Sequence, residues 1–113
     1  MIKIFHNPKC SKSREGLCTL QDLGKEVEIV QYIKNPLSFN EIKALLKVLK
    51  IDAIDLVRTK EAVWKEHFKG KELTSDAIIQ AMVDFPQLIE RPIVVNGNKA
   101  VIARPAEKIK EVL

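Results

Sequence analysis

The stretch that decides the fold is MIKIFHNPKCSKSREGLCTLQDLGKEVEIVQY, residues 1–32. Within Met1–Phe5, Ile2 and Ile4 alternate with Lys3 as in a strand, and Val27–Tyr32 is rich in β-branched residues. Ser11–Leu23 between them is typical of a helix, and Gly24 suits the position just after its end. A strand, a helix and a second strand within about thirty residues predict a βαβ unit with parallel strands and a right-handed crossover.

The helix between these strands carries Leu17, Leu20 and Leu23, whose spacing predicts its buried stripe. Cys18 flanks that stripe and is expected to be a small, partly buried residue. It lies about 12 Å from Cys10 along an intact helix. A disulfide needs Cα atoms within about 7 Å, so we expect both cysteines to be free thiols with no bridge between them.

The rest of the chain completes the sheet and adds helices. Ser38–Glu41 has the S-x-x-E form of a capping box and predicts a helix, and shorter helices are expected over Ala53–Val57 and from Thr74 to Pro86. Pro92–Ala103 predicts a hairpin, because the Asn-Gly dipeptide at positions 96 and 97 accepts the positive φ of a tight turn. Pro105 then opens a terminal helix in its first turn.

This order of elements predicts a single α/β domain over residues 1–113. Its core is a four-stranded mixed sheet with helices, formed by residues of about 1–34 and 88–113. A helical segment of about residues 38–86 is inserted between the two parts of the core.

The composition excludes several classes of protein. The net charge is +4, but 19 basic residues are interleaved with 15 acidic ones and only 5% of residues are aromatic, which disfavours nucleic-acid binding and favours attraction of small anions. No apolar run of about 18 residues predicts a membrane span, and the N-terminus lacks a secretory signal pattern. We expect a cytoplasmic protein, and a monomer.

Cys10 is the main candidate for a reactive residue. Its sulfur is predicted to lie at the N-terminus of the first helix, where backbone N–H groups without helical partners and the helix dipole favour a thiolate. The same place can bind an anion. The residues that form this helix start are Ser11, Lys12, Ser13 and Arg14. His6, the last residue of the first strand, either packs there or tunes the thiolate, and both interpretations stay open.

Two other cysteine chemistries fit the spacing poorly. Zinc would draw on His6, Cys10, Cys18 and His67, but no C-x2-C or H-x3-H spacing is present, so no metal is expected. A phosphatase-like C-x5-R loop is also absent, because only three residues separate Cys10 from Arg14.

Four separated motifs resemble those of one known family. They are HNPKCSKSR at His6–Arg14, LVR at Leu56–Arg58, ERPIVV at Glu90–Val95, and Arg104-Pro105. Together they resemble the glutaredoxin-linked arsenate reductases, which are thioredoxin-like proteins with an inserted helical segment. The likeness runs from Met1 to the C-terminus.

The resemblance implies a function and a set of site residues. Cys10 would be the nucleophile that reduces arsenate to arsenite, with His6 close to the thiolate. Arg58, Arg91 and Arg104 would hold the oxyanion, and Pro92 would match the cis-proline of thioredoxin-like folds. Glutathione would be the reducing co-substrate and glutaredoxin the protein partner, with no bound cofactor.

The hairpin supports part of this assignment independently. Arg91 and Arg104 precede and follow the predicted turn by similar distances, so both should lie at the open end of one ladder. That end lies beside Cys10 if the strand after Pro92 runs antiparallel to the first strand. Guanidinium groups match the oxygens of arsenate, although surface ion pairs are the commoner use of arginine.

Two relatives on the same scaffold remain as alternatives. The redox regulator Spx, which binds RNA polymerase, resembles this chain in fold but carries a C-x-x-C switch, and here Ser13 stands at the fourth position. A glutathione-dependent thiol reductase without arsenate activity would share the fold. The three arginines argue against that alternative.

Overall fold

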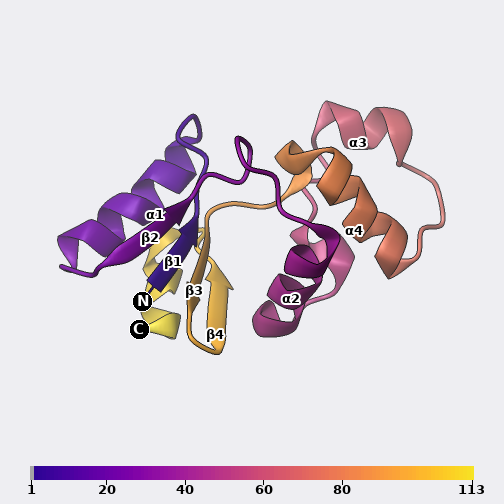
Figure 1. Ribbon diagram of the computed structural model, residues 1–113. Helices are drawn as coiled ribbons and strands as arrows, with labels where there is room; N and C mark the ends of the chain where they lie inside the picture. Colours follow the sequence, from indigo (N-terminus) through magenta and orange to yellow (C-terminus); the bar gives the residue numbers. More distant parts are fainter. Residues whose placement is uncertain (1) are drawn as a thin grey trace. The chain divides into compact units, whose positions relative to one another are not determined.

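The computed structural model describes residues 2–113 (Figure 1), so Met1, which we predicted to begin the first strand, lies outside the described residues. The chain divides into two compact units. The first contains the chain up to Asn35 together with Arg91–Leu113, and the second is Pro36–Glu90.

The first unit is built on a sheet with the strand order β2-β1-β3-β4. The strands are β1 (Ile2–Phe5), β2 (Val27–Val30), β3 (Ile93–Asn96) and β4 (Lys99–Ile102). β1 pairs in parallel with β2 and antiparallel with β3, and β3 pairs antiparallel with β4. The predicted four-stranded mixed sheet is therefore confirmed.

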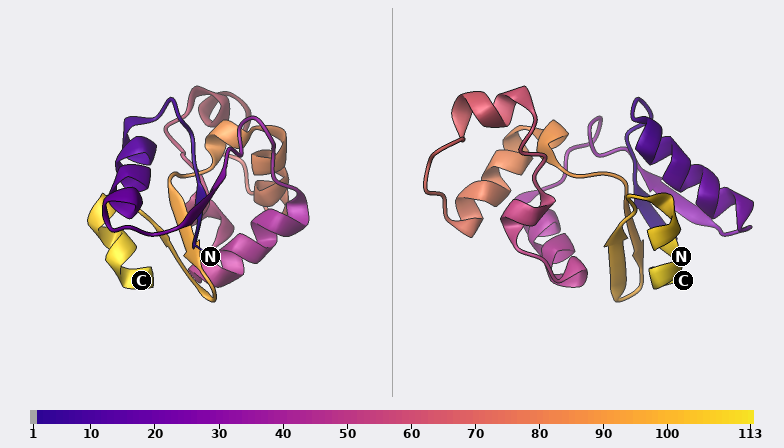
Figure 2. Two further views of the ribbon diagram at one scale, coloured as in Figure 1. Left: turned by 60° about the vertical axis from the view of Figure 1, so that its left-hand side comes forward. Right: turned by 180° about the vertical axis from the view of Figure 1, so that it is seen from behind.

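Helix α1 (Ser11–Asp22) and the 3-10 helix η3 (Ala106–Val112) share one hydrophobic core with this sheet (Figure 2). The buried members of that core are Ile2, Ile4, Leu20, Val94, Ala103, Ile109 and Val112. Because the side chains of a strand alternate between its two faces, Ile2 and Ile4 lie on the same face of β1. Burial of this face positions α1, and with it Cys10.

The buried stripe of α1 differs from our prediction. It includes Leu20, as predicted, together with Ser13 and Gly16. Leu17 is partly buried against the core, whereas Leu23 is 44% exposed. Leu23 is the residue that caps the C-terminus of α1, and Gly24 follows it with a φ of +71°. Cys18 is exposed, so the prediction of partial burial was wrong, because this stripe follows another face of the helix.

The hairpin turn lies one residue later than predicted. Asn96 still pairs with Lys99, so Gly97 and Asn98 form the turn, and Gly97 has a φ of +62°. Glycine at the first central position is typical of a type II′ turn. The side-chain amide of Asn96 donates to the Val112 carbonyl at 2.7 Å, which holds this residue in the strand.

Two further boundaries in the first unit differ from the prediction. β2 ends at Val30 rather than Tyr32, because the Gln31 carbonyl accepts the Asn35 N–H at 2.9 Å and begins a turn. Pro105 caps η3 in an extended conformation, with a ψ of 168°, and does not lie in the first helical turn.

The second unit is helical. Its elements are α2 (Phe39–Leu49), η1 (Ala53–Leu56), α3 (Ala62–His67), α4 (Ser75–Asp84) and η2 (Pro86–Leu88). The predicted capping box of Ser38 and Glu41 is confirmed, and α4 packs against α2, η1 and η2. The sequence analysis missed α3, which has only six residues. Among residues 2–113, no helix is long and apolar enough to cross a membrane.

Candidate active site

Cys10 is the N-cap residue of α1, with φ −99° and ψ 124°. Its carbonyl accepts the Arg14 N–H at 3.0 Å, and its own N–H donates to the Asn7 carbonyl at 3.0 Å. The side chain is partly exposed. The sulfur therefore lies at the helix N-terminus, beside donors that have no carbonyl partner within the helix.

The pKa of the Cys10 thiol is lowered. Burial raises this pKa, but hydrogen bonds from the Ser13 N–H, the Arg91 side chain and the Lys12 N–H lower it, as does the Arg91 charge. Both N–H groups belong to the first turn of α1. The thiolate is thus favoured by the helix start and by one cation from the other end of the chain.

Arg91 carries two polar atoms that the protein does not satisfy. In the part of the chain that the structure describes, its Nε and Nη1 are buried and have no hydrogen-bond partner. A buried donor without a partner is costly, and one that belongs to a cation is more so. These donors suit an oxyanion placed next to the Cys10 sulfur.

The hairpin brings Arg91 and Arg104 to the same end of its ladder. Ile93 pairs with Ile102, and one step further the Ala103 N–H donates to the Pro92 carbonyl at 2.9 Å. The next positions outward are Arg91 and Arg104. Both arginines are half-buried, and the peptide bonds Arg91–Pro92 and Arg104–Pro105 are both cis.

His6 contacts Ser13 in the site. Its Nδ1 lies 2.7 Å from the Ser13 Oγ, which also accepts the Asn7 N–H at 2.9 Å, and both side chains are buried. Burial lowers the pKa of His6, the Arg14 charge adds to this, and a backbone hydrogen bond at Ser13 opposes it. His6 thus connects to the sulfur through Ser13, whose own N–H lowers the Cys10 pKa.

From the sequence, Ser13 was predicted only as part of the helix start, and its contact with His6 was not predicted. The available signal was its position. Ser13, Gly16 and Leu20 follow helical spacing on the buried side of α1, so a serine there must find a polar partner inside the protein.

Arg58 belongs to the second unit, where it is ion-paired. Its Nη1 contacts Glu61, and its Nε lies 3.5 Å from Glu90. The Arg58 N–H donates to Leu88 and the Glu90 N–H donates to Leu56, on either side of an antiparallel bridge. Neither ion pair was predicted from the sequence. The pair with Glu90 depends on the bridge that aligns two distant segments, whereas Glu61 lies only three residues after Arg58.

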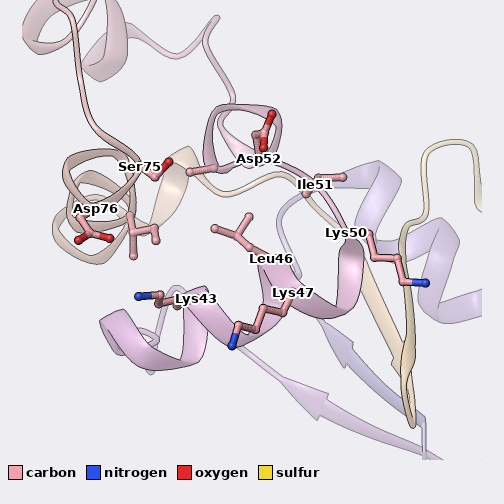
Figure 3. Close-up of a pocket in the computed structure, with 10 residues that line it drawn as sticks. Lys43, Leu46, Lys47, Lys50, Ile51, Asp52, Ser75 and Asp76 are labelled. Carbon is pink, nitrogen blue, oxygen red and sulfur yellow. The ribbon is translucent and has the colours of Figure 1, made fainter.

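A cavity of about 390 Å³ lies in the second unit, between α2, η1 and the start of α4 (Figure 3). Lys43, Lys47 and Asp76 are among its lining residues, and its floor includes Leu46. None of the predicted site residues lines it. Within residues 2–113, no three His, Cys, Asp or Glu side chains group as metal ligands.

The sheet order, the helix that follows β1 and the Cys10 thiol of lowered pKa at the start of that helix define a thioredoxin-like protein with a single cysteine at this position. Comparison with known proteins makes the assignment specific. The ArsC family model matches residues 5–112, and the chain therefore belongs to the ArsC family.

Relatives extend over the whole chain. YfgD of Escherichia coli K12, described as uncharacterized, is 46% identical over 99% of this chain and 96% of its own. A protein named arsenate reductase from Neisseria meningitidis serogroup A is 41% identical over 99% and 97%. The solved structure of an arsenate reductase from Vibrio cholerae is 40% identical in sequence, with a TM-score of 0.96. The match covers 99% of this chain and 97% of that one. The predicted thioredoxin-like fold is confirmed.

Proposed function

We propose that this protein reduces arsenate to arsenite, with the Cys10 thiolate as nucleophile and with glutathione and glutaredoxin as reductants. The observation that carries the proposal is the Arg91 guanidinium, which lowers the pKa of Cys10 and has Nε and Nη1 buried without a hydrogen-bond partner among the described residues. A thiolate beside such donors suits attack on a tetrahedral oxyanion. The relatives named arsenate reductase support the choice of substrate.

The first step changes no oxidation state. The Cys10 sulfur bonds to arsenic(V) as one arsenic–oxygen bond breaks, and the oxygen leaves as water after taking up a proton. Glutathione then attacks this adduct, so that a disulfide forms between glutathione and Cys10. The sulfur–arsenic electron pair passes to arsenic, and the thiol proton passes to the arsenite that leaves.

Glutaredoxin closes the cycle by thiol–disulfide exchange. Its thiolate takes the glutathione from the mixed disulfide and restores the Cys10 thiolate. The reaction needs reduced thiols, so we place it in the cytoplasm. We treat the protein as a monomer.

The arginines and His6 have distinct roles in the proposal. Arg91 stabilises the thiolate and then the charge on the arsenic oxygens, and Arg104 joins it from the same end of the hairpin. Arg58 is the third oxyanion-binding residue, and it must exchange a carboxylate of Glu61 or Glu90 for the anion. His6 acts on the sulfur through Ser13.

The test is arsenite formation by the Cys10→Ser variant with glutathione and glutaredoxin. We expect no turnover from Cys10→Ser and unchanged turnover from Cys18→Ala, because Cys18 is exposed on another face of α1. Retained turnover in Cys10→Ser would end the proposal. Thiol exchange at Cys10 without arsenate reduction would instead support a glutathione-dependent thiol reductase.

A further inference from the structure

The chain segment around Cys10 is positively charged. No Asp or Glu occurs between Met1 and Arg14, whereas Lys9, Lys12 and Arg14 lie within four residues of the cysteine. All three side chains are exposed, and the sulfur is partly exposed beside them. We call these three residues the cationic rim.

The first turn of α1 also lacks the acidic residue that balances the dipole of other helices in this chain. α2 carries Glu41 and α4 carries Asp76 in that turn, but α1 carries none. The nearest acid along the chain is Glu15, whose carboxylate lies 3.7 Å from the Lys12 Nζ in an exposed pair. Such a pair is weak and salt-sensitive, so the rim keeps most of its positive charge.

The rim is held in place by contacts that leave its charge intact. The Lys9 N–H donates to the Asn7 side-chain oxygen at 3.1 Å, and the Arg14 Nη1 donates to the Pro8 carbonyl at 2.8 Å. Both acceptors are neutral. The rim therefore differs from the buried donors of Arg91, since it faces solvent and can meet a ligand larger than an oxyanion.

We propose that Lys9, Lys12 and Arg14 recognise the carboxylates of the thiol donor, so that Cys10 exchanges preferentially with anionic peptide thiols and disulfides. This inference takes the thiol donor from the proposed function, but it does not require arsenate to be the substrate. In the exchange, the Cys10 thiolate attacks one sulfur of a disulfide, a new disulfide forms, and the other sulfur leaves as a thiolate. Paired charges across an interface raise the association rate and fix the orientation of the partner.

The test measures exchange rates of Cys10 in a Cys18→Ala background with three small disulfides, namely anionic dithiodipropionate, neutral hydroxyethyl disulfide and cationic cystamine. The key quantity is the rate with the anionic disulfide relative to the neutral one. We expect the double variant Lys9→Gln, Lys12→Gln to lower this ratio by roughly three- to tenfold. High salt should lower the wild-type ratio in the same direction.

The matched control is the double variant Lys25→Gln, Lys99→Gln. It removes two exposed lysines at the end of the strands that lies away from Cys10. Its ratio should equal that of the parent. Three results would overturn the proposal. The ratio could stay unchanged in the rim variant, it could fall equally in the control, or the rim variant could react more slowly with all three disulfides to the same extent. The last outcome would trace the effect to the thiolate itself. No arsenate is used in this experiment. A protein that does not reduce arsenate could therefore still show the charge preference, and the two proposals are tested separately.

Discussion

Cys10 and Arg91 are brought together by backbone pairing from opposite ends of the chain, and the Arg91 guanidinium lowers the pKa of the Cys10 thiol. β1 ends at Phe5 and β3 begins at Ile93, and these two residues pair in the antiparallel ladder. The loop to Cys10 and the segment from Arg91 therefore start at the same edge of the sheet. Register, rather than a flexible loop, fixes the cation beside the thiolate.

Replacing Arg91 by Gln should raise the pKa of Cys10, because the thiolate loses a hydrogen bond and a nearby positive charge. The alkylation rate of Cys10 at neutral pH should fall roughly tenfold, the low end of the loss of a hydrogen bond to a charged group, because the sulfur is partly exposed. Lys99→Gln removes a charge at the turn end of the same hairpin and should leave the rate unchanged. A pH profile identical to that of the wild type would contradict this role of Arg91.

Ser13→Ala should destabilise the protein, because it removes the hydroxyl that serves both the His6 ring and the Asn7 N–H. Leaving buried polar groups without a partner costs about 1–3 kcal/mol. Urea unfolding measures this loss. The exposed Ser11→Ala variant is the control and should change the free energy of unfolding by less than about 0.5 kcal/mol. Equal stability of both variants would show that the Ser13 hydroxyl has no structural role.

Gly16→Ala should destabilise the packing of α1, although alanine is the better helix former. A Cβ at Gly16 would lie 2.8 Å from the Cγ of Pro92, and that ring cannot move aside as a flexible side chain would. Overpacking of this kind costs about 1–3 kcal/mol, whereas alanine gains at most about 1 kcal/mol in helix propensity. The exposed Gln21→Ala variant controls for propensity. A Gly16→Ala protein as stable as the wild type in urea would contradict the close contact.

Acid should weaken the fold through His6. Burial lowers the pKa of His6, so the unfolded chain takes up a proton that the folded protein resists. The free energy of unfolding should therefore fall as the pH is lowered from about 7 to about 5, through the ordinary histidine pKa of about 6.5. Urea midpoints across this range should show a shallower fall in His6→Gln. The same slope in both proteins would argue that His6 titrates normally.

Elements with strong local signals were predictable from the sequence. The βαβ unit, the Ser38 capping box and the hairpin rest on periodicity, capping and turn residues, which act over short distances. α3 was missed because Ala62–His67 is too short for a helical period, and its cap, Glu61, is not a preferred N-cap residue. Leu23 was misplaced because the hydrophobic pattern does not show where a helix ends.

Only part of the candidate site was predictable from the sequence. The position of Cys10 follows from local structure, and the shared ladder end of Arg91 and Arg104 follows from hairpin register. The choice of His6 as the partner of Ser13 and the pairing of Arg58 with Glu90 depend on tertiary packing that no spacing rule encodes.

The most direct test of the central claim is a single turnover of the reduced protein with arsenate and glutathione, without glutaredoxin. The account predicts that each chain releases about one arsenite and gains one glutathione, which peptide mass analysis should locate on Cys10. Arsenite release with Cys10 unmodified, or a glutathione adduct confined to Cys18, would contradict a mechanism based on the Cys10 thiolate.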